Sequence, residues 1–200
     1  IEVLGGPASF LWGQGAVGGA INYVSKIANR EKQGHEIYAE GGMWGNRRAA
    51  YSYYGQIGNT PNWIQIAGAY KGSDGWVERT PQNSGVGSLS WLTDLTPNIS
   101  NTVAVEFQSE EQDAYWGTPL LNPNFGNLVF AEGSPLLPAH QGKWDPGQRF
   151  KNYNAKNPVF DQQVLWVRDI SEYKMSEATQ FKNTFYFYRA DRQYENVEIY

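Results

Sequence analysis

The sequence predicts a mainly β protein: about seven strands of an incomplete antiparallel transmembrane β-barrel, preceded by the end of a small α+β domain. Three observations lead to this fold class. Short segments alternate apolar and polar residues with a period of two, as in a strand with one apolar face. The connections between these segments differ regularly in length. Tyr, Trp and Gly are abundant, with 13, 8 and 22 residues, while charged residues make up only 18% of the chain.

The first part of the chain, residues 1–28, is rich in Gly and small side chains and is predicted to be a separate unit. The elements expected in it are a strand over 1–4, a helical turn over 8–12 and a strand over 20–25. Residues 29–34 are polar and are expected to form a linker. Residues 35–200 are then the predicted barrel segment.

Alternation in the second part is clearest at residues 103–107, where Val103, Val105 and Phe107 share one face and Glu106 lies on the other. The other expected strands cover residues 35–41, 47–57, 62–70, 84–93, 162–169 and 179–191. A barrel strand needs only about 10 residues to cross a bilayer. The run at 164–167 is apolar at successive positions, so the sequence does not predict its register.

The expected connections are MWGN, GNTPN, SDGWVERTPQN, DLTPNIS, residues 113–160 and ISEYKMSE. The second, fourth and sixth are short, whereas the third and fifth are longer, as expected for outer-membrane barrels with short turns on one side and long loops on the other. The first is short although it falls on the long-loop side. A sheet in lipid must close, and plugged barrels have about 22 strands, so about a third of a barrel is predicted.

The opening segment IEVLGGPASFLWGQGAVGGAINYVSK resembles the end of the plug domain of TonB-dependent outer-membrane receptors. The plug-motif residues are Gly6, Pro7, Gly13, Gly15, Gly18 and Gly19. Glycine permits close backbone approach, which a compact plug inside a barrel needs. Residues 13–18 also match G-x-G-x-x-G, but a strand is expected after them rather than a helix, so a dinucleotide site is not predicted.

The segment YWGTPL at residues 115–120 resembles a motif of the siderophore receptors within this family, and residues 189–192 and 196–198 resemble a later strand of the same subfamily. The resemblance implies a receptor in the outer membrane of a Gram-negative bacterium, surrounded by its lipid. Such receptors bind a ferric siderophore from outside and import it with energy from the TonB–ExbB–ExbD complex. The contact with that complex would be made by a segment N-terminal to this chain.

One position departs from the family pattern. Many members carry Arg or Lys at the position of Gly5, where the cation is thought to pair with glutamates of the barrel. Gly5 cannot form such a pair, so if that pair helps to lock the plug, either another contact or a different way of holding the plug is expected. Trp12 also replaces the more usual Tyr.

Outward loops are expected to contact the ligand, because aromatic faces and cations suit anionic or catecholate chelates. The candidate residues are Tyr115, Trp116, Phe125, Trp144, Arg149 and Tyr153. The same aromatic side chains would also suit packing within the loop or an interfacial girdle. Trp63 and Trp91, at the ends of expected strands, are interpreted as girdle residues.

The remaining composition disfavours several functions. A net charge of −4 argues against a nucleic-acid partner. Without Cys and with only two His, disulfides, thiolate sites and a His-rich metal site are not expected. Glu110 and Glu111 are adjacent in a strand, so they point to opposite faces and cannot act as an acid–base pair. No catalytic site and no resident cofactor are predicted, and neither a membrane-spanning helix nor a signal peptide is recognised.

Two alternatives stay open. A TonB-dependent receptor for another nutrient, such as cobalamin or a glycan, would share the same fold. A secreted β-rich carbohydrate-binding protein or enzyme would account for the Trp and Tyr content, but not for the plug-like opening or the alternation of short and long connections.

Overall fold

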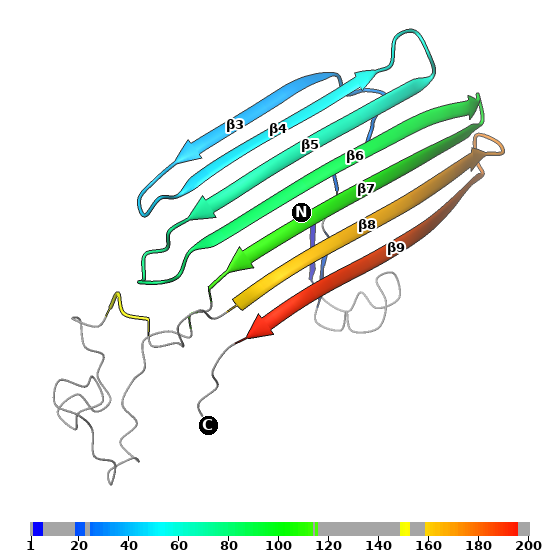
Figure 1. Ribbon diagram of the computed structural model, residues 1–200. Coiled ribbons are helices and arrows are strands. Elements are labelled where there is room, and N and C mark those ends of the chain that lie inside the picture. The colour runs from blue at the N-terminus through cyan, green and yellow to red at the C-terminus, as the bar shows by residue number, and fades with distance from the viewer. Residues whose placement is uncertain are drawn as a thin grey trace, which may run out of the picture.

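The computed structural model describes residues 2–5, 19–22, 25–113, 115, 149–152 and 159–195. Within these ranges the regular structure consists of strands alone, in a two-stranded sheet and a seven-stranded sheet (Figure 1). No helix in the described ranges is long and apolar enough to cross a membrane.

The first sheet pairs β1 (Glu2–Gly5) with β2 (Gly19–Asn22) in antiparallel orientation. Both strands were expected from the sequence, with slightly different ends. Gly19 of the plug motif lies in β2, directly opposite Gly5. The expected helical turn at 8–12 and the motif residues from Gly6 to Gly18 lie outside the described residues, and the division into plug, linker and barrel stays a prediction.

The second sheet contains all seven strands that were expected. They are β3 (Gly34–Gly41), β4 (Arg47–Gln56), β5 (Asn62–Ser73), β6 (Gln82–Thr96), β7 (Ile99–Gln112), β8 (Val159–Lys174) and β9 (Gln180–Glu195). They pair in chain order, each antiparallel to the next. The predicted antiparallel sheet is therefore confirmed.

Several strands extend further than the alternation indicates. The segment at 103–107 is the middle of β7, which has 14 residues. The expected turn ISEYKMSE is too long, because β8 continues to Lys174, and the expected turn DLTPNIS shrinks to Pro97 and Asn98 between β6 and β7. Polar residues occupy both faces near the strand ends, so the alternation fades there while backbone pairing continues.

The register sorts the side chains onto an apolar and a polar face, because successive residues of a strand point to opposite sides. One row of cross-strand partners on the apolar face is Ile66, Leu89, Val105, Val167 and Phe187. The adjacent row on the polar face is Gln65, Ser90, Ala104, Arg168 and Tyr186. The register of the apolar run at 164–167, which the sequence left open, puts Leu165 and Val167 on the apolar face.

Burial differs between the two faces. The apolar face is uncovered, with Ile66, Leu89 and Phe187 each more than two-fifths exposed. The buried side chains of the sheet lie on the polar face instead. They are Ser52, Tyr54, Gln65, Ser90, Leu92, Ser100, Thr102 and Ala104. An exposed apolar face and a covered polar face reverse the usual soluble arrangement and fit a wall between lipid and a wet interior.

Three glycines on the apolar face lie directly opposite aromatic residues. Gly68 is opposite Tyr51, Gly85 is opposite Tyr70, and Gly87 is opposite Phe107. An aromatic ring beside a glycine restores the cover that the missing side chain would leave open.

The two edges of the seven-stranded sheet are open in the described chain, since β3 and β9 each have a single neighbour. Strands β3, β5, β7 and β9 end on one side, at the lower left of Figure 1. The connections on that side span residues 42–46, 74–81 and 113–158, against 57–61, 97–98 and 175–179 on the other. The predicted contrast in connection length is confirmed, including the short first connection.

A charge scan across one strand tests the assignment of the faces. Replacement of Leu165 by Lys would place a cation on the apolar face near the middle of β8, which costs about 2–4 kcal/mol in lipid. The neighbouring control, Val164→Lys, places the same charge on the polar face and should cost much less. Urea unfolding of the complete membrane-inserted protein measures both, and equal losses would contradict the assignment.

Candidate functional site

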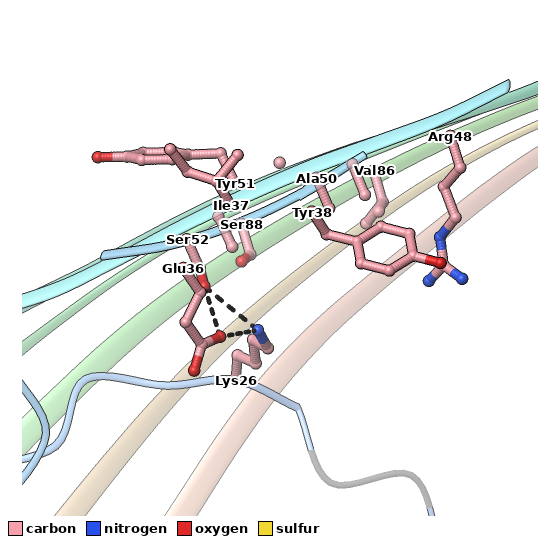
Figure 2. A pocket seen from close by; sticks show the side chains of 13 residues that line it. Lys26, Glu36, Ile37, Tyr38, Arg48, Ala50, Tyr51, Ser52, Val86 and Ser88 are labelled. Carbon is pink, nitrogen blue, oxygen red and sulfur yellow. Dashed lines mark hydrogen bonds and ion pairs between the residues drawn. The ribbon is translucent and has the colours of Figure 1, made fainter. Parts of the chain in front are cut away.

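Two places on the sheet combine segments that are distant in sequence. The first is the segment of residues 25–33, called the strap here, which crosses the polar face from β3 to β6. Its Lys26 Nζ donates to Glu36 Oε2 at 3.0 Å and to Ser52 Oγ at 3.3 Å, while Ser52 Oγ donates to Glu36 at 3.0 Å (Figure 2). The start of the strap is thus tied to β3 and β4 together.

The middle of the strap is bound to β5 and β6. The Ala28 N–H donates to Ser90 Oγ at 2.5 Å, and Ala28 is 5% exposed. Gln65 is fully buried beneath it. With its amide nitrogen toward the acceptors, Gln65 donates to the Lys26 carbonyl and to Ser90 Oγ, both at 3.2 Å, and accepts from Ser88 Oγ at 3.1 Å. These bonds satisfy strap backbone that would otherwise be buried without partners.

The end of the strap is held by charge and by aromatic rings. Arg30 pairs with Asp94 of β6 through both Nε, at 3.2 Å, and Nη2. Its guanidinium also lies 5.6 Å from the ring centre of Trp63, and Lys32 Nζ lies 5.4 Å from that of Tyr54. The hydrogen bond to Asp94 raises the pKa of Arg30 above its ordinary value, although burial opposes this.

The strap is held to the sheet by charge as well as by hydrogen bonds. Its two cations Lys26 and Arg30 pair with the carboxylates Glu36 and Asp94 of the sheet. Residues 29–34 were expected to be only a polar linker, and these ion pairs were not predicted. The signal was the spacing of cations at 26, 30 and 32, just before a strand that begins with a polar residue and Glu36.

The second place is the outer end of the sheet, where the connection 74–81 packs against residues 149–152. The Glu78 N–H donates to the Phe150 carbonyl at 2.8 Å, and Lys151 forms an ion pair with Glu78 at 2.8 Å. Arg79 Nη2 donates to the Asn152 carbonyl at 2.5 Å, and Asn152 Nδ2 donates to the Arg79 carbonyl at 3.0 Å. Two loops that are about seventy residues apart in the chain are therefore fastened together.

The turn at 74–81 requires glycine at one position. Gly75 has a φ of 81°, and a Cβ atom there would approach Thr80 Oγ1 to 2.1 Å. This tight turn leaves Val77 inside, with 2% exposure, and directs Trp76 outward, with 46% exposure.

Trp76 is the centre of what is called the rim cluster here: Trp76, Tyr115, Arg149 and Phe150. The Trp76 ring is edge-on to Tyr115 at 6.3 Å and to Phe150 at 6.2 Å. The Arg149 guanidinium lies 5.3 Å from the centre of the Phe150 ring. Exposed aromatic edges beside a cation can bind an anionic ligand that carries flat groups.

The structure brings together two of the six predicted ligand residues, Tyr115 and Arg149. The other four, Trp116, Phe125, Trp144 and Tyr153, lie outside the described residues. Trp76 was missed, although a Trp in a long connection on the same side of the sheet was a usable signal. Beside the cluster, burial raises the pKa of Asp113, nearby Arg79 lowers it, and Asp161 raises it further.

The two girdle expectations have different outcomes. Trp91 lies on the apolar face, is 47% exposed, and donates from Nε1 to Asn62 Oδ1 at 3.0 Å. Trp63 was assigned wrongly, because its register with Gln56 and Leu92 puts it on the polar face beneath Arg30. Glu110 and Glu111 pair with successive residues of β8, which confirms that they point to opposite faces. No group of three or more His, Cys, Asp or Glu suited to a metal occurs in the described ranges.

Comparison with known proteins finds no matching family model. Among solved structures, the ferripyoverdine receptor of the outer membrane of Pseudomonas aeruginosa, bound to ferripyoverdine, is similar with a TM-score of 0.69 and 22% identity over 86% of this chain and 21% of its own. A complex of FpvAI with pyocin S2 is similar with a TM-score of 0.74 and 21% identity, over 92% of this chain and 22% of its own.

A third structure, P. aeruginosa FpvA bound to a heterologous pyoverdine and iron, gives a TM-score of 0.70 and 21% identity over 95% of this chain and 24% of its own. The chain therefore shares the fold of these receptors in the region that it covers, and it spans between 21% and 24% of their length.

A hydroxyl deletion tests the strap. Ser90→Ala removes the acceptor of the buried Ala28 N–H and should cost about 1–3 kcal/mol, with faster hydrogen exchange at Ala28. Ser88→Ala is the matched control, because it removes a hydroxyl two residues away that contacts Gln65 but not the strap. Equal exchange at Ala28 in both variants would show that the bond does not hold the strap.

Proposed function

We propose that this chain is the plug-to-barrel segment of an outer-membrane receptor that binds a ferric siderophore and imports it with energy from the TonB–ExbB–ExbD complex. The observation that carries the proposal is the fold, shared over 86% or more of the chain with the ferripyoverdine receptor and with two FpvA complexes. The plug-like opening and the YWGTPL segment support the same assignment. In this proposal, residues 1–28 are the end of the plug, 29–34 the connection and 35–200 the first part of the barrel.

The open edges of the sheet support a larger barrel. Backbone groups at the edges of β3 and β9 need partners in lipid, since an unpaired N–H or C=O costs several kcal/mol there. Further strands would supply these partners. The apolar face would then lie against outer-membrane lipid and the polar face would line the lumen.

The rim cluster is the proposed ligand contact. It lies at the end of the sheet that carries the long connections, which is the outer side in this family of barrels. Trp76, Tyr115 and Phe150 offer aromatic edges, and Arg149 offers a positive charge. A ferric chelate is an anionic or polar ligand with flat iron-binding groups, and stacking combined with charge suits it. The connection of residues 113–158, which contains Tyr115 and Arg149, also contains four further proposed ligand contacts: Trp116, Phe125, Trp144 and Tyr153.

In the proposed transport cycle, the strap would stay attached to the barrel wall. A force that reaches the plug from the inner side would be carried by ion pairs and hydrogen bonds to β3, β4, β5 and β6. The C-terminal end of the plug would therefore stay on the wall while other parts of the plug move. The structural neighbours are receptors, and a receptor rather than an enzyme is proposed here as well.

A receptor for cobalamin or a glycan is the second candidate, because aromatic side chains such as Trp76 also stack on sugar rings. The cation in the rim cluster favours an anionic chelate over a neutral glycan.

Ligand titration of the complete detergent-solubilised receptor tests the proposal. Ferric pyoverdine and a panel of other ferric siderophores should include at least one ligand that binds the wild type. Trp76→Ala should weaken that ligand roughly 30-fold, the loss expected when an aromatic anchor worth about 2 kcal/mol is removed.

The matched control for that titration is Trp91→Ala. Trp91 has nearly the same exposure, 47% against 46%, but lies on the apolar face near the opposite end of its strand. Its replacement should leave affinity unchanged. Binding of cobalamin or a glycan, with no ferric siderophore bound, would overturn the proposal.

A further inference from the structure

Two cationic residues of the polar face are cross-strand partners just below the rim. Arg48 of β4 is directly opposite Lys71 of β5, one pair inward from the outer end of that strand pairing. Directly opposed side chains in a sheet have Cβ atoms about 5 Å apart, and like charges at that distance destabilise the sheet. Such a pair calls for a negative partner.

No carboxylate in the described part of the chain forms an ion pair with either cation. Glu40 is the neighbour of Arg48 on β3, but its carboxylate accepts from the Tyr38 hydroxyl and, at 3.4 Å, from Asn46 Nδ2. The Arg48 guanidinium instead lies over the Tyr38 ring, 5.2 Å from its centre.

Other cations of the polar face differ in this respect. Lys26, Arg30, Arg168 and Lys182 each form an ion pair with a carboxylate, respectively Glu36, Asp94, Glu106 and Glu172. Among the described residues, Lys32, Lys174 and Arg192 of this face also form no ion pair. Arg48 and Lys71 differ from these because they lie directly opposite each other in the sheet.

The wall beside these cations is hollowed. A hollow of about 450 Å³ is bordered by Arg48 and Lys71, floored by Ala69 and Val86, and flanked by the polar side chains of Ser84 and Gln108. A second hollow of about 420 Å³ adjoins it and shares Arg48, Ala69 and Val86. Figure 2 shows the second hollow with the Arg48 side chain at one end and Lys26 at the other. Small side chains leave room there for a group of several atoms.

We propose that Arg48 and Lys71, called the wall pair here, form an oxyanion-binding site for a small anionic ligand, separate from the rim cluster. The inference rests on the proposed function for the statement that the polar face lines a lumen. The guanidinium presents a planar fork to a carboxylate or similar oxyanion, and the ammonium supplies a second positive charge. Ser84 and Gln108 supply neutral hydrogen-bonding groups.

The position of the wall pair favours a ligand that arrives from outside. The connection that carries Trp76 begins at Asp74, only three residues beyond Lys71 along the chain. An anionic ligand that leaves the rim inward meets the wall pair next. The site would hold such a ligand at the upper wall during its passage.

Citrate, an iron-free tricarboxylate, is the probe for this site. Calorimetric titration at low ionic strength, where exposed charges are least screened, would use the complete receptor in a nonionic detergent. Citrate should bind the wild type, and the double variant Arg48→Gln/Lys71→Gln should bind it roughly tenfold more weakly or worse. The charge-conserving variant Arg48→Lys should lose less affinity than the double variant, because it keeps the charge but not the planar fork. Lys182→Gln, which removes a cation of the same face outside the hollow, should bind citrate as the wild type does.

The melting temperature of the same variants separates a ligand site from a structural pair. If the wall pair awaits a ligand, the double variant loses like-charge repulsion and its Tm stays equal or rises. A lower Tm without any loss of citrate affinity would show that a carboxylate of the same protein already occupies the pair, and would overturn the inference.

Equal citrate affinity in the wild type and the double variant, or none in the wild type, would also overturn it. Because citrate carries no iron here, these outcomes do not depend on which ferric ligand the rim takes. If the receptor binds citrate at the wall pair but no ferric siderophore at the rim, the proposed function is contradicted and the wall-pair site is not.

Discussion

The unbroken antiparallel hydrogen-bond ladder from β3 to β9 is the constraint on which the rest of the structure depends. Each strand is fixed to its neighbour residue by residue, so the side-chain period of two becomes a property of the whole sheet. A slip of one residue in any pairing would move the side chains of every later strand from the apolar face to the polar face and the reverse. The ladder also positions Ser90, Asp94 and Glu36 on the same face as the strap, and it opposes Arg48 to Lys71.

The electrostatics of the polar face follow from that arrangement. The strap cations Lys26 and Arg30 form ion pairs with Glu36 and Asp94 on the strands. These pairs are partly exposed, so each alone contributes little to stability. They act together with the buried hydrogen bond from the Ala28 N–H to Ser90 Oγ, in the middle of the strap where water is excluded. The wall pair near the rim forms no ion pair with a described carboxylate. This difference from the strap cations is the reason for proposing that the wall pair is available to a ligand.

The sequence was sufficient for the number, order and direction of the strands, because most central segments alternate and every turn except residues 175–179 contains Gly, Pro or Asn. It was insufficient where alternation fails. Val164 to Val167 are apolar on both faces, and only pairing with β7 assigns Leu165 and Val167 to one side. Trp63 was misassigned for a different reason: its position at a strand end was used, although the alternation of Ile64, Gln65 and Ile66 places it on the face of Gln65. The strap and the surroundings of Trp76 depend on contacts between segments distant in the chain, such as Ala28 with Ser90 and Trp76 with Phe150, which local patterns do not encode.

The central claim is that the seven-stranded sheet is a barrel wall with lipid on its apolar face. The chain contains no Cys, so single cysteines carrying a spin label can be introduced along β5 of the complete membrane-inserted protein, at Ile64, Gln65, Ile66 and Ala67. Collision with oxygen, which concentrates in lipid, and with a water-soluble nickel chelate reports the surroundings of each label. We expect oxygen contact to dominate for Ile64→Cys and Ile66→Cys, and contact with oxygen to be low for Gln65→Cys and Ala67→Cys. Equal oxygen contact along the strand, or the opposite alternation, would contradict the assignment of the faces and every site derived from it.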